Sequence, residues 1–74
     1  MLFRSIKYQL PVHNWVTLKV YNVLGMEVEK LVDELQNAGF KSVSFDARNL
    51  ASGVYFYRLA AGEFVDVRKM ILLK

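Results

Sequence analysis

The sequence predicts a small all-β domain, arranged as a β-sandwich or a small barrel. Apolar and polar residues alternate with a period of two along most of the chain, which is typical of strands with one buried face. The alternating runs recur roughly every 8–12 residues, as in sandwiches and barrels. Glycines and a single proline stand between the runs, where turns are expected. We therefore expect six to seven short strands and no long helix.

The first two strands are expected at residues 3–10 and 15–23. In the first, Ile6, Tyr8 and Leu10 share one face, and Pro11 ends the run because proline cannot donate to a sheet. In the second, the apolar face carries Val16, Leu18 and Val20. A turn at Leu24-Gly25 follows, where glycine is free to adopt a positive φ.

Residues 26–37 fit two predictions. Met26 and Val28 alternate with glutamates, which favours a strand to about Leu31 followed by a loop. The same segment also has helical spacing, and Asn37-Ala38-Gly39 could end a helix. We favour the strand because the preceding turn is so tight, and the helix remains the alternative.

The remaining strands are expected at residues 40–46, 54–60 and 64–73. In the first of them we expect Phe40, Val43 and Phe45 to belong to the core. Asp46 is expected to accept an Asx-type hydrogen bond from the backbone just after that strand. The next strand carries Tyr55, Tyr57 and Leu59 on one face and Val54, Phe56 and Arg58 on the other, which is typical of a central strand covered on both sides.

Composition excludes several classes of protein. The 74 residues include no cysteine, so disulfides and thiolate metal sites are excluded. The net charge of +3 comes from basic residues scattered along the chain, whereas nucleic-acid-binding proteins cluster them, so no nucleic-acid partner is expected. No apolar run has the length of a signal peptide core or of a membrane-spanning helix.

Catalytic and cofactor motifs are also missing from the sequence. His13 is the only histidine and stands beside Asn14 in an expected surface turn. Glu27 and Glu29 could form an acid–base pair, but their alternation with apolar residues indicates the solvated face of a strand. Four separate glycines form no phosphate-binding loop. We expect a non-enzyme with no catalytic, cofactor-binding or metal-binding residues.

Exposed aromatic residues leave a carbohydrate-binding surface as a further possibility. We expect the following rings to lie opposite the core face, where sugars could stack on them: Trp15, Tyr21, Phe56 and Phe64. Packing against a second layer or another domain explains the same rings, and is the interpretation we favour.

Residues 6–74 resemble the type A C-terminal sorting domain of the type IX secretion system. The resemblance is carried by IKYQLP, VTLKVYNVLGMEV, LVDELQNAGFKSVSFDA, NLASGVYFYRLAAGEF and KMILLK, in that order and spacing. The immunoglobulin-like module of flagellar hook-capping proteins is similar around SGVYFYRL. The terminal KMILLK and the short loop at Arg48-Asn49 favour the sorting domain.

The resemblance implies an immunoglobulin-like antiparallel β-sandwich that directs an attached cargo protein through an outer-membrane translocon. It implies these recognition residues: Gly53, Tyr55, Lys69, Met70, Ile71, Leu72, Leu73 and Lys74. Implied partners are the secretion machinery, its processing protease and an upstream cargo domain, and export ends at the cell surface or outside the cell. The alternative function is a structural interaction or assembly domain.

Residues 1–74 are expected to form one domain, a fragment of a longer secreted protein. Such sandwiches leave edge strands unpaired, so a homodimer through edge strands is a further expectation.

Overall fold

The computed structural model describes residues 3–73 and contains six strands in that range and no helix. The strands are β1 (Phe3–Leu10), β2 (Asn14–Tyr21), β3 (Glu27–Gln36), β4 (Gly39–Asp46), β5 (Gly53–Ala61) and β6 (Phe64–Leu72). Five of the six lie within two residues of the predicted bounds. None of the described residues therefore forms a helix long and apolar enough to cross a membrane.

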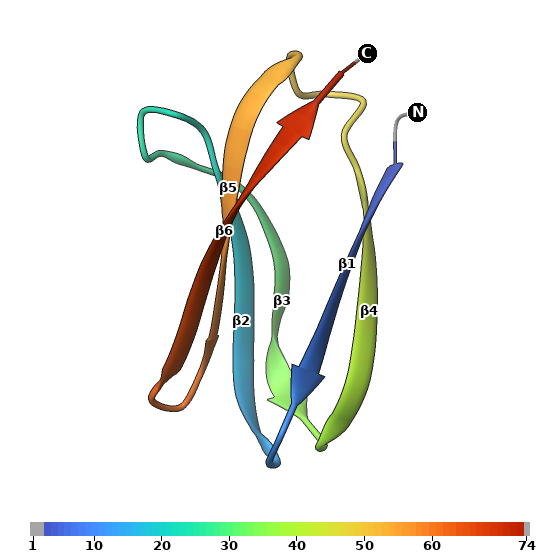
Figure 1. The fold of residues 1–74 in the computed structure, drawn as a ribbon, viewed down its shortest axis with the longest axis vertical. Helices are drawn as coiled ribbons and strands as arrows, with labels where there is room; N and C mark the ends of the chain where they lie inside the picture. Colours follow the sequence, from blue (N-terminus) through green and yellow to red (C-terminus); the bar gives the residue numbers. More distant parts are fainter. Residues whose placement is uncertain (1–2, 74) are drawn as a thin grey trace.

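The strands form two antiparallel sheets in a small sandwich-like arrangement (Figure 1). One sheet contains β1 and β4, and the other has the order β3-β2-β5-β6. β1 begins and β6 ends at the same end of the molecule (Figure 1). The prediction of an all-β sandwich is confirmed.

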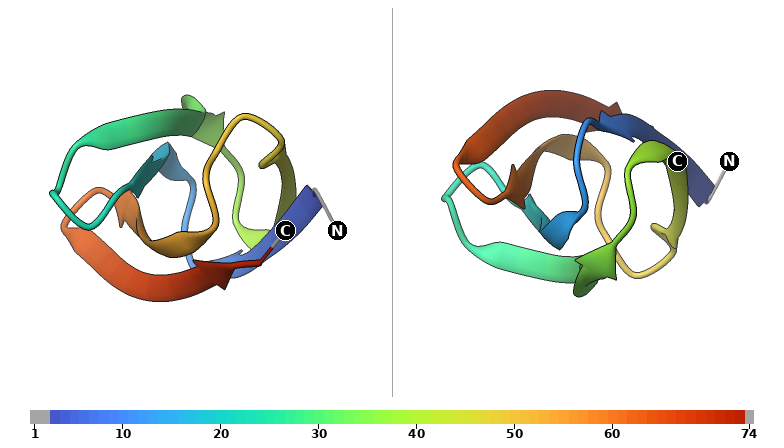
Figure 2. Two further views of the ribbon diagram at one scale, coloured as in Figure 1. Left: turned by 90° about the horizontal axis from the view of Figure 1, so that it is seen from above. Right: turned by 90° about the horizontal axis from the view of Figure 1, so that it is seen from below.

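The core lies between the two sheets, which surround it in the end-on views of Figure 2. Val16, Leu18 and Val20 of the central strand β2 are fully buried, as their alternation predicted. Ile6 and Leu10 of β1 cover them from the opposite sheet. β2 is paired on both edges and covered on its inner face, and it supplies the largest fully buried side chains of the core.

Residues 27–36 form a strand throughout, so the helical alternative is wrong. The strand also continues to Gln36, beyond the predicted end near Leu31. The cause is a β-bulge: Leu18 lies opposite Val32, while Lys19 lies opposite Lys30, which leaves Leu31 as an extra residue. A bulge interrupts the two-residue period locally, and the sequence pattern therefore appeared to end there.

Two aromatic residues lie on the face opposite to the predicted one. Phe40 is 84% exposed because it lies opposite Gln9 on the outer face of the two-stranded sheet, so its assignment to the core is wrong. Phe64 was expected on the outer face of the sheet. It pairs with the buried Ala61 and lies on the inner side instead, where it is half-exposed. Val43 and Phe45 do pack in the core as predicted.

Candidate functional site

The residues that could support catalysis are dispersed over the surface. Among residues 3–73, no three His, Asp or Glu side chains are close enough together to hold a metal ion. His13 is exposed, and its Nδ1 lies 3.0 Å from Oδ1 of Asn37. Glu27 forms an exposed ion pair with Lys19, 3.4 Å between Oε1 and Nζ, and Glu29 is also exposed. These groups have the environment of solvated surface charges.

The recognition residues implied by the family resemblance lie in two segments of the sequence, and the structure brings these segments together. In the β5–β6 ladder, Gly53 lies opposite Leu72 and Tyr55 lies opposite Met70. The start of β5 and the end of β6 thus form one end of the four-stranded sheet. Lys74 lies outside the described residues.

Tyr55 fixes the connection that leads into β5. Its ring is buried, and its hydroxyl donates a 2.8 Å hydrogen bond to the carbonyl oxygen of Ala51. At the start of the same connection, Oδ1 of Asp46 accepts a 3.0 Å hydrogen bond from the amide of Arg48, which confirms the predicted Asx-type contact. Gly53 has φ of 153°, a conformation that favours glycine. Tyr55 and Gly53 therefore shape this end of the domain from within.

The end of β6 exposes one of its two faces. Met70 and Leu72 point inward and pack against the core. Ile71 is 49% exposed and Leu73 is 78% exposed, and the side chain of Lys69 is exposed beside them. No described strand pairs with the outer edge of β6, so the outward main-chain groups of this strand are accessible, apart from the carbonyl of Ile71, which accepts a hydrogen bond from Arg4. This end offers apolar side chains, a cation and main-chain groups together.

One contact at this end was not predicted from the sequence. The guanidinium of Arg4, on β1, donates a hydrogen bond to the carbonyl oxygen of Ile71. The two residues are 67 positions apart, so no local pattern could reveal the contact. Arg4 joins the first strand to the last across the boundary between the two sheets.

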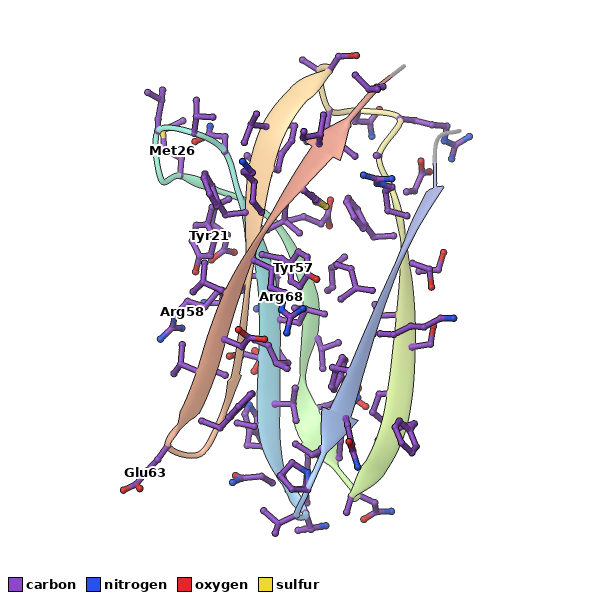
Figure 3. The ribbon with its side chains drawn as sticks, viewed as in Figure 1. Tyr21, Met26, Tyr57, Arg58, Glu63 and Arg68 are labelled. Atoms are coloured by element: carbon purple, nitrogen blue, oxygen red, sulfur yellow. The ribbon has the colours of Figure 1, made fainter. Side chains whose placement is uncertain are left out.

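Charges on the outer face of the four-stranded sheet differ between its halves. On the β2–β3 half, Asp33 accepts a 2.8 Å hydrogen bond from the indole N–H of Trp15 and pairs with Lys30 at 3.4 Å. These two contacts lower the pKa of the Asp33 carboxyl, with the indole as the larger cause. On the β5–β6 half, the outward charged residues are the cations Arg58 and Lys69. In Figure 3, Arg58 and Tyr21 project from this outer side, away from β1.

A family model described as a secretion system C-terminal sorting domain matches residues 4–73. No curated protein and no solved structure matches the chain significantly. The family match covers nearly every residue of the two sheets, including the paired ends of β5 and β6.

Proposed function

Because this chain belongs to the family of secretion system C-terminal sorting domains, we propose that the terminal part of β6 is the segment that the secretion machinery recognises. Membership makes the domain a non-catalytic targeting module for type IX secretion, which interacts with that machinery and leads to transport across the outer membrane. The proposal concerns where on this chain the recognition takes place.

The observation that carries the proposal is the exposure of apolar side chains at the end of a strand whose outer edge is free. Ile71 and Leu73, the latter just beyond the end of β6, are both exposed beside the free edge of that strand. A free strand edge can add a strand from a partner, with main-chain hydrogen bonds for affinity and side chains for specificity. Lys69 adds a charge to the same surface, and Lys74, outside the described residues, belongs to the proposal on sequence alone.

The inward-facing residues of the segment have a supporting role in this proposal. Met70 and Leu72 anchor the strand in the core, and the buried Tyr55 and the partly buried Gly53 shape the connection beside it. Substitutions at these four positions would affect recognition through the fold, and they are therefore poor probes of direct contact.

The test is export of a periplasmic reporter fused upstream of residues 1–74 in a bacterium that has type IX secretion. We expect the double variant Ile71→Asp, Leu73→Asp to reduce secreted reporter at least tenfold, because an added partner strand would have to bury two carboxylates. The matched control is Val12→Asp, an exposed valine in the turn between the two sheets, which should leave export near the parent level. Equal export of all three fusions would contradict the proposal, provided circular dichroism shows that each domain is folded.

We further propose that residues 1–74 act as the C-terminal domain of a longer secreted protein, with an upstream cargo and a processing protease as partners. The family supports a cargo, and the product would be located at the cell surface or in the extracellular medium. Western blots of whole cells, medium and surface-digested cells, with antibodies to cargo and domain, would separate these locations. A cargo that keeps the domain after export would contradict the role of the protease.

We also propose that self-association of the domain, where it occurs, uses its edge strands. The outer edges of β3 and β6 have no partner strand among the described residues. Sedimentation equilibrium should show a dimer whose dissociation constant rises at least tenfold in a variant with proline at an edge position, because proline removes a main-chain donor. A dimer unaffected by edge prolines in both strands would contradict this proposal.

A further inference from the structure

The space between β1 and β6 is bordered by two strand edges that have no partner. Among the described strands, β1 pairs only with β4, and β6 pairs only with β5. We call the space between these two free edges the β1–β6 seam. It is where the two-stranded sheet meets the four-stranded sheet on one side of the sandwich (Figures 1 and 2).

The seam is closed at the end where β6 terminates. There the guanidinium of Arg4 donates a hydrogen bond to the carbonyl oxygen of Ile71. This carbonyl therefore points away from β5, toward the seam. In an antiparallel strand, the main-chain groups of every second residue point to the same edge. The N–H and C=O groups of Val65, Val67 and Lys69 thus also face the seam, without an Arg4 to occupy them.

At its other end the seam opens into a cavity of about 210 Å³. The floor of the cavity is apolar and consists of Leu18 and Leu59, both buried, with the ring of Tyr57 beside them. Its walls come from both free strands, Ile6 from β1 and Phe64 from β6. Small-molecule pockets usually measure about 300–1,000 Å³, so this cavity has the size for one or two side chains instead.

An extended segment added at the free edge of β6 would fit both features. Its main chain would pair with Val65, Val67 and Lys69, and its side chains would alternate between the two faces. Side chains on the inner face would enter the cavity over Leu59, on the side where Figure 3 shows Tyr57 and Arg68. Those on the outer face would lie beside Val67 and Lys69.

The charges around the seam define the chemistry of that segment. Asp66 forms a 3.0 Å contact with the guanidinium of Arg68, so the carboxylate in the cavity wall is already neutralised. Lys7 in the opposite wall and Lys69 on the outer face have no ion-pair partner among the described residues. The seam therefore carries an excess of positive charge over an apolar floor.

From these contacts we infer that residues 65–69 of β6 accept one extended segment of a partner protein, in which apolar side chains alternate with acidic ones. The apolar side chains fill the cavity, and the acidic ones lie beside the cation Lys69. This site adjoins the exposed end of β6 proposed for recognition above and shares Lys69 with it, but it does not depend on that proposal.

The probe is a seven-residue peptide of alternating valine and glutamate, blocked at both ends, added to ¹⁵N-labelled domain. We expect saturating peptide to slow hydrogen exchange at the amides of Val65, Val67 and Lys69 at least tenfold, while amides on the free edge of β3 are unchanged. A peptide with lysine in place of glutamate should bind at least fivefold more weakly. No protection at millimolar peptide, or protection confined to another edge, would overturn the inference.

Two variants separate main-chain pairing from charge attraction. Val67→Pro removes one seam-facing N–H and, because proline is tolerated on edge strands, should abolish peptide binding in a domain that stays folded. Lys69→Glu should reverse the preference, so that the lysine peptide binds more tightly. The matched charge reversal Lys30→Glu, on β3 at the opposite edge of the four-stranded sheet, should keep the glutamate preference. Unchanged binding by Val67→Pro would assign the effect to charge alone and overturn the inference.

The same exchange experiment identifies a competing occupant. If the three amides become protected in the absence of peptide as protein concentration rises, the edge belongs to a second copy of the chain. That outcome would be the self-association proposed above, taking place through β6, and it would overturn the inference; self-association through β3 would leave the three amides unprotected.

Discussion

β2 and β6 have similar apolar content but opposite surroundings. In β2, Val16, Leu18 and Val20 are fully buried between paired neighbours. In β6, Val67 and Ile71 are about half-exposed on an edge strand, with exposed fractions of 56% and 49%. Apolar residues of one sheet can therefore have different environments, depending on whether their strand is central or at the edge. Those of β2 stabilise the fold, whereas Val67 and Ile71 of β6 remain half in water.

The largest expected effect is the difference in stability between a core substitution in β2 and an edge substitution in β6. Leu18→Ala should lower the free energy of unfolding by about 2–5 kcal/mol, because it leaves a cavity in the core. Ile71→Ala should cost less than about 1 kcal/mol, because half of that side chain is already in water. Urea denaturation followed by tryptophan fluorescence measures both. Equal losses would break the distinction between the central and the edge strand.

The next effect tests how the β5–β6 hairpin is held beside β2. Gly62 has φ of 62°, and a Cβ there would lie 2.4 Å from Nδ2 of Asn14. Gly62→Ala should therefore cost about 1–2 kcal/mol for the backbone conformation, plus about 0.5–1.5 kcal/mol as Asn14 moves and loses its hydrogen bond to the amide of Trp15.

The matched control is Gly25→Ala. Gly25 has φ of 81°, and a Cβ there would meet nothing within 4 Å. Only the backbone cost should appear in this variant. If chemical denaturation gives the same loss for both glycines, the contact with Asn14 contributes nothing.

A smaller effect concerns the start of β5, which pairs with the end of β6. Tyr55→Phe removes the hydrogen bond to the carbonyl of Ala51 while keeping the buried ring. The loss should be about 0.5–1.5 kcal/mol. Amide exchange should accelerate most in residues 47–53, next to the released carbonyl. Uniform acceleration across all strands would indicate that Tyr55 acts on the whole core.

Much of this fold could be predicted from alternation, because each strand has one buried and one solvated face. Alternation assigned Val16, Leu18 and Val20 to the core and Tyr57 and Arg58 to opposite faces, and both assignments are confirmed. It failed where a bulge added Leu31 to β3. Phe40 was assigned to the core because it is hydrophobic. The two-residue period instead places it on the outward face with Ser42 and Ser44.

The division into two sheets and the seam could not be predicted. Strand pairing depends on contacts between distant segments, and a two-residue period is the same for any pairing partner. The contact of Arg4 with Ile71 and the cavity between β1 and β6 both result from this distant pairing. The proposed recognition residues could be named only from the resemblance to a family, because the exposure of Ile71 and Leu73 has no separate signal in the sequence.

The smallest expected effect concerns Asp33 on β3, at the edge of the four-stranded sheet opposite to β6. The lowered pKa of Asp33 means that its contacts stabilise the fold above the carboxyl's ordinary pKa, and that this contribution is lost as the pH falls through the lowered value. Trp15→Phe should raise the Asp33 pKa toward its ordinary value, because the indole N–H is the main cause of the shift. A carbon-detected NMR titration measures the pKa of the Asp33 carboxyl in the parent and in the variant. An unchanged pKa would leave Lys30 as the cause.

The position of the chain's two ends has a mechanical consequence. β1 begins and β6 finishes at one end of the sandwich, and Arg4 spans the gap between them. Tension applied between an upstream cargo and a receptor bound to the last strand would therefore act first on the strand pairs nearest this end. The Arg4 contact would break first, and then the pairs of each ladder would break one after another, beginning with Gly53 and Leu72 in the β5–β6 ladder. A domain built this way yields to a weak pull, whereas a strand loaded in shear resists with all its hydrogen bonds at once.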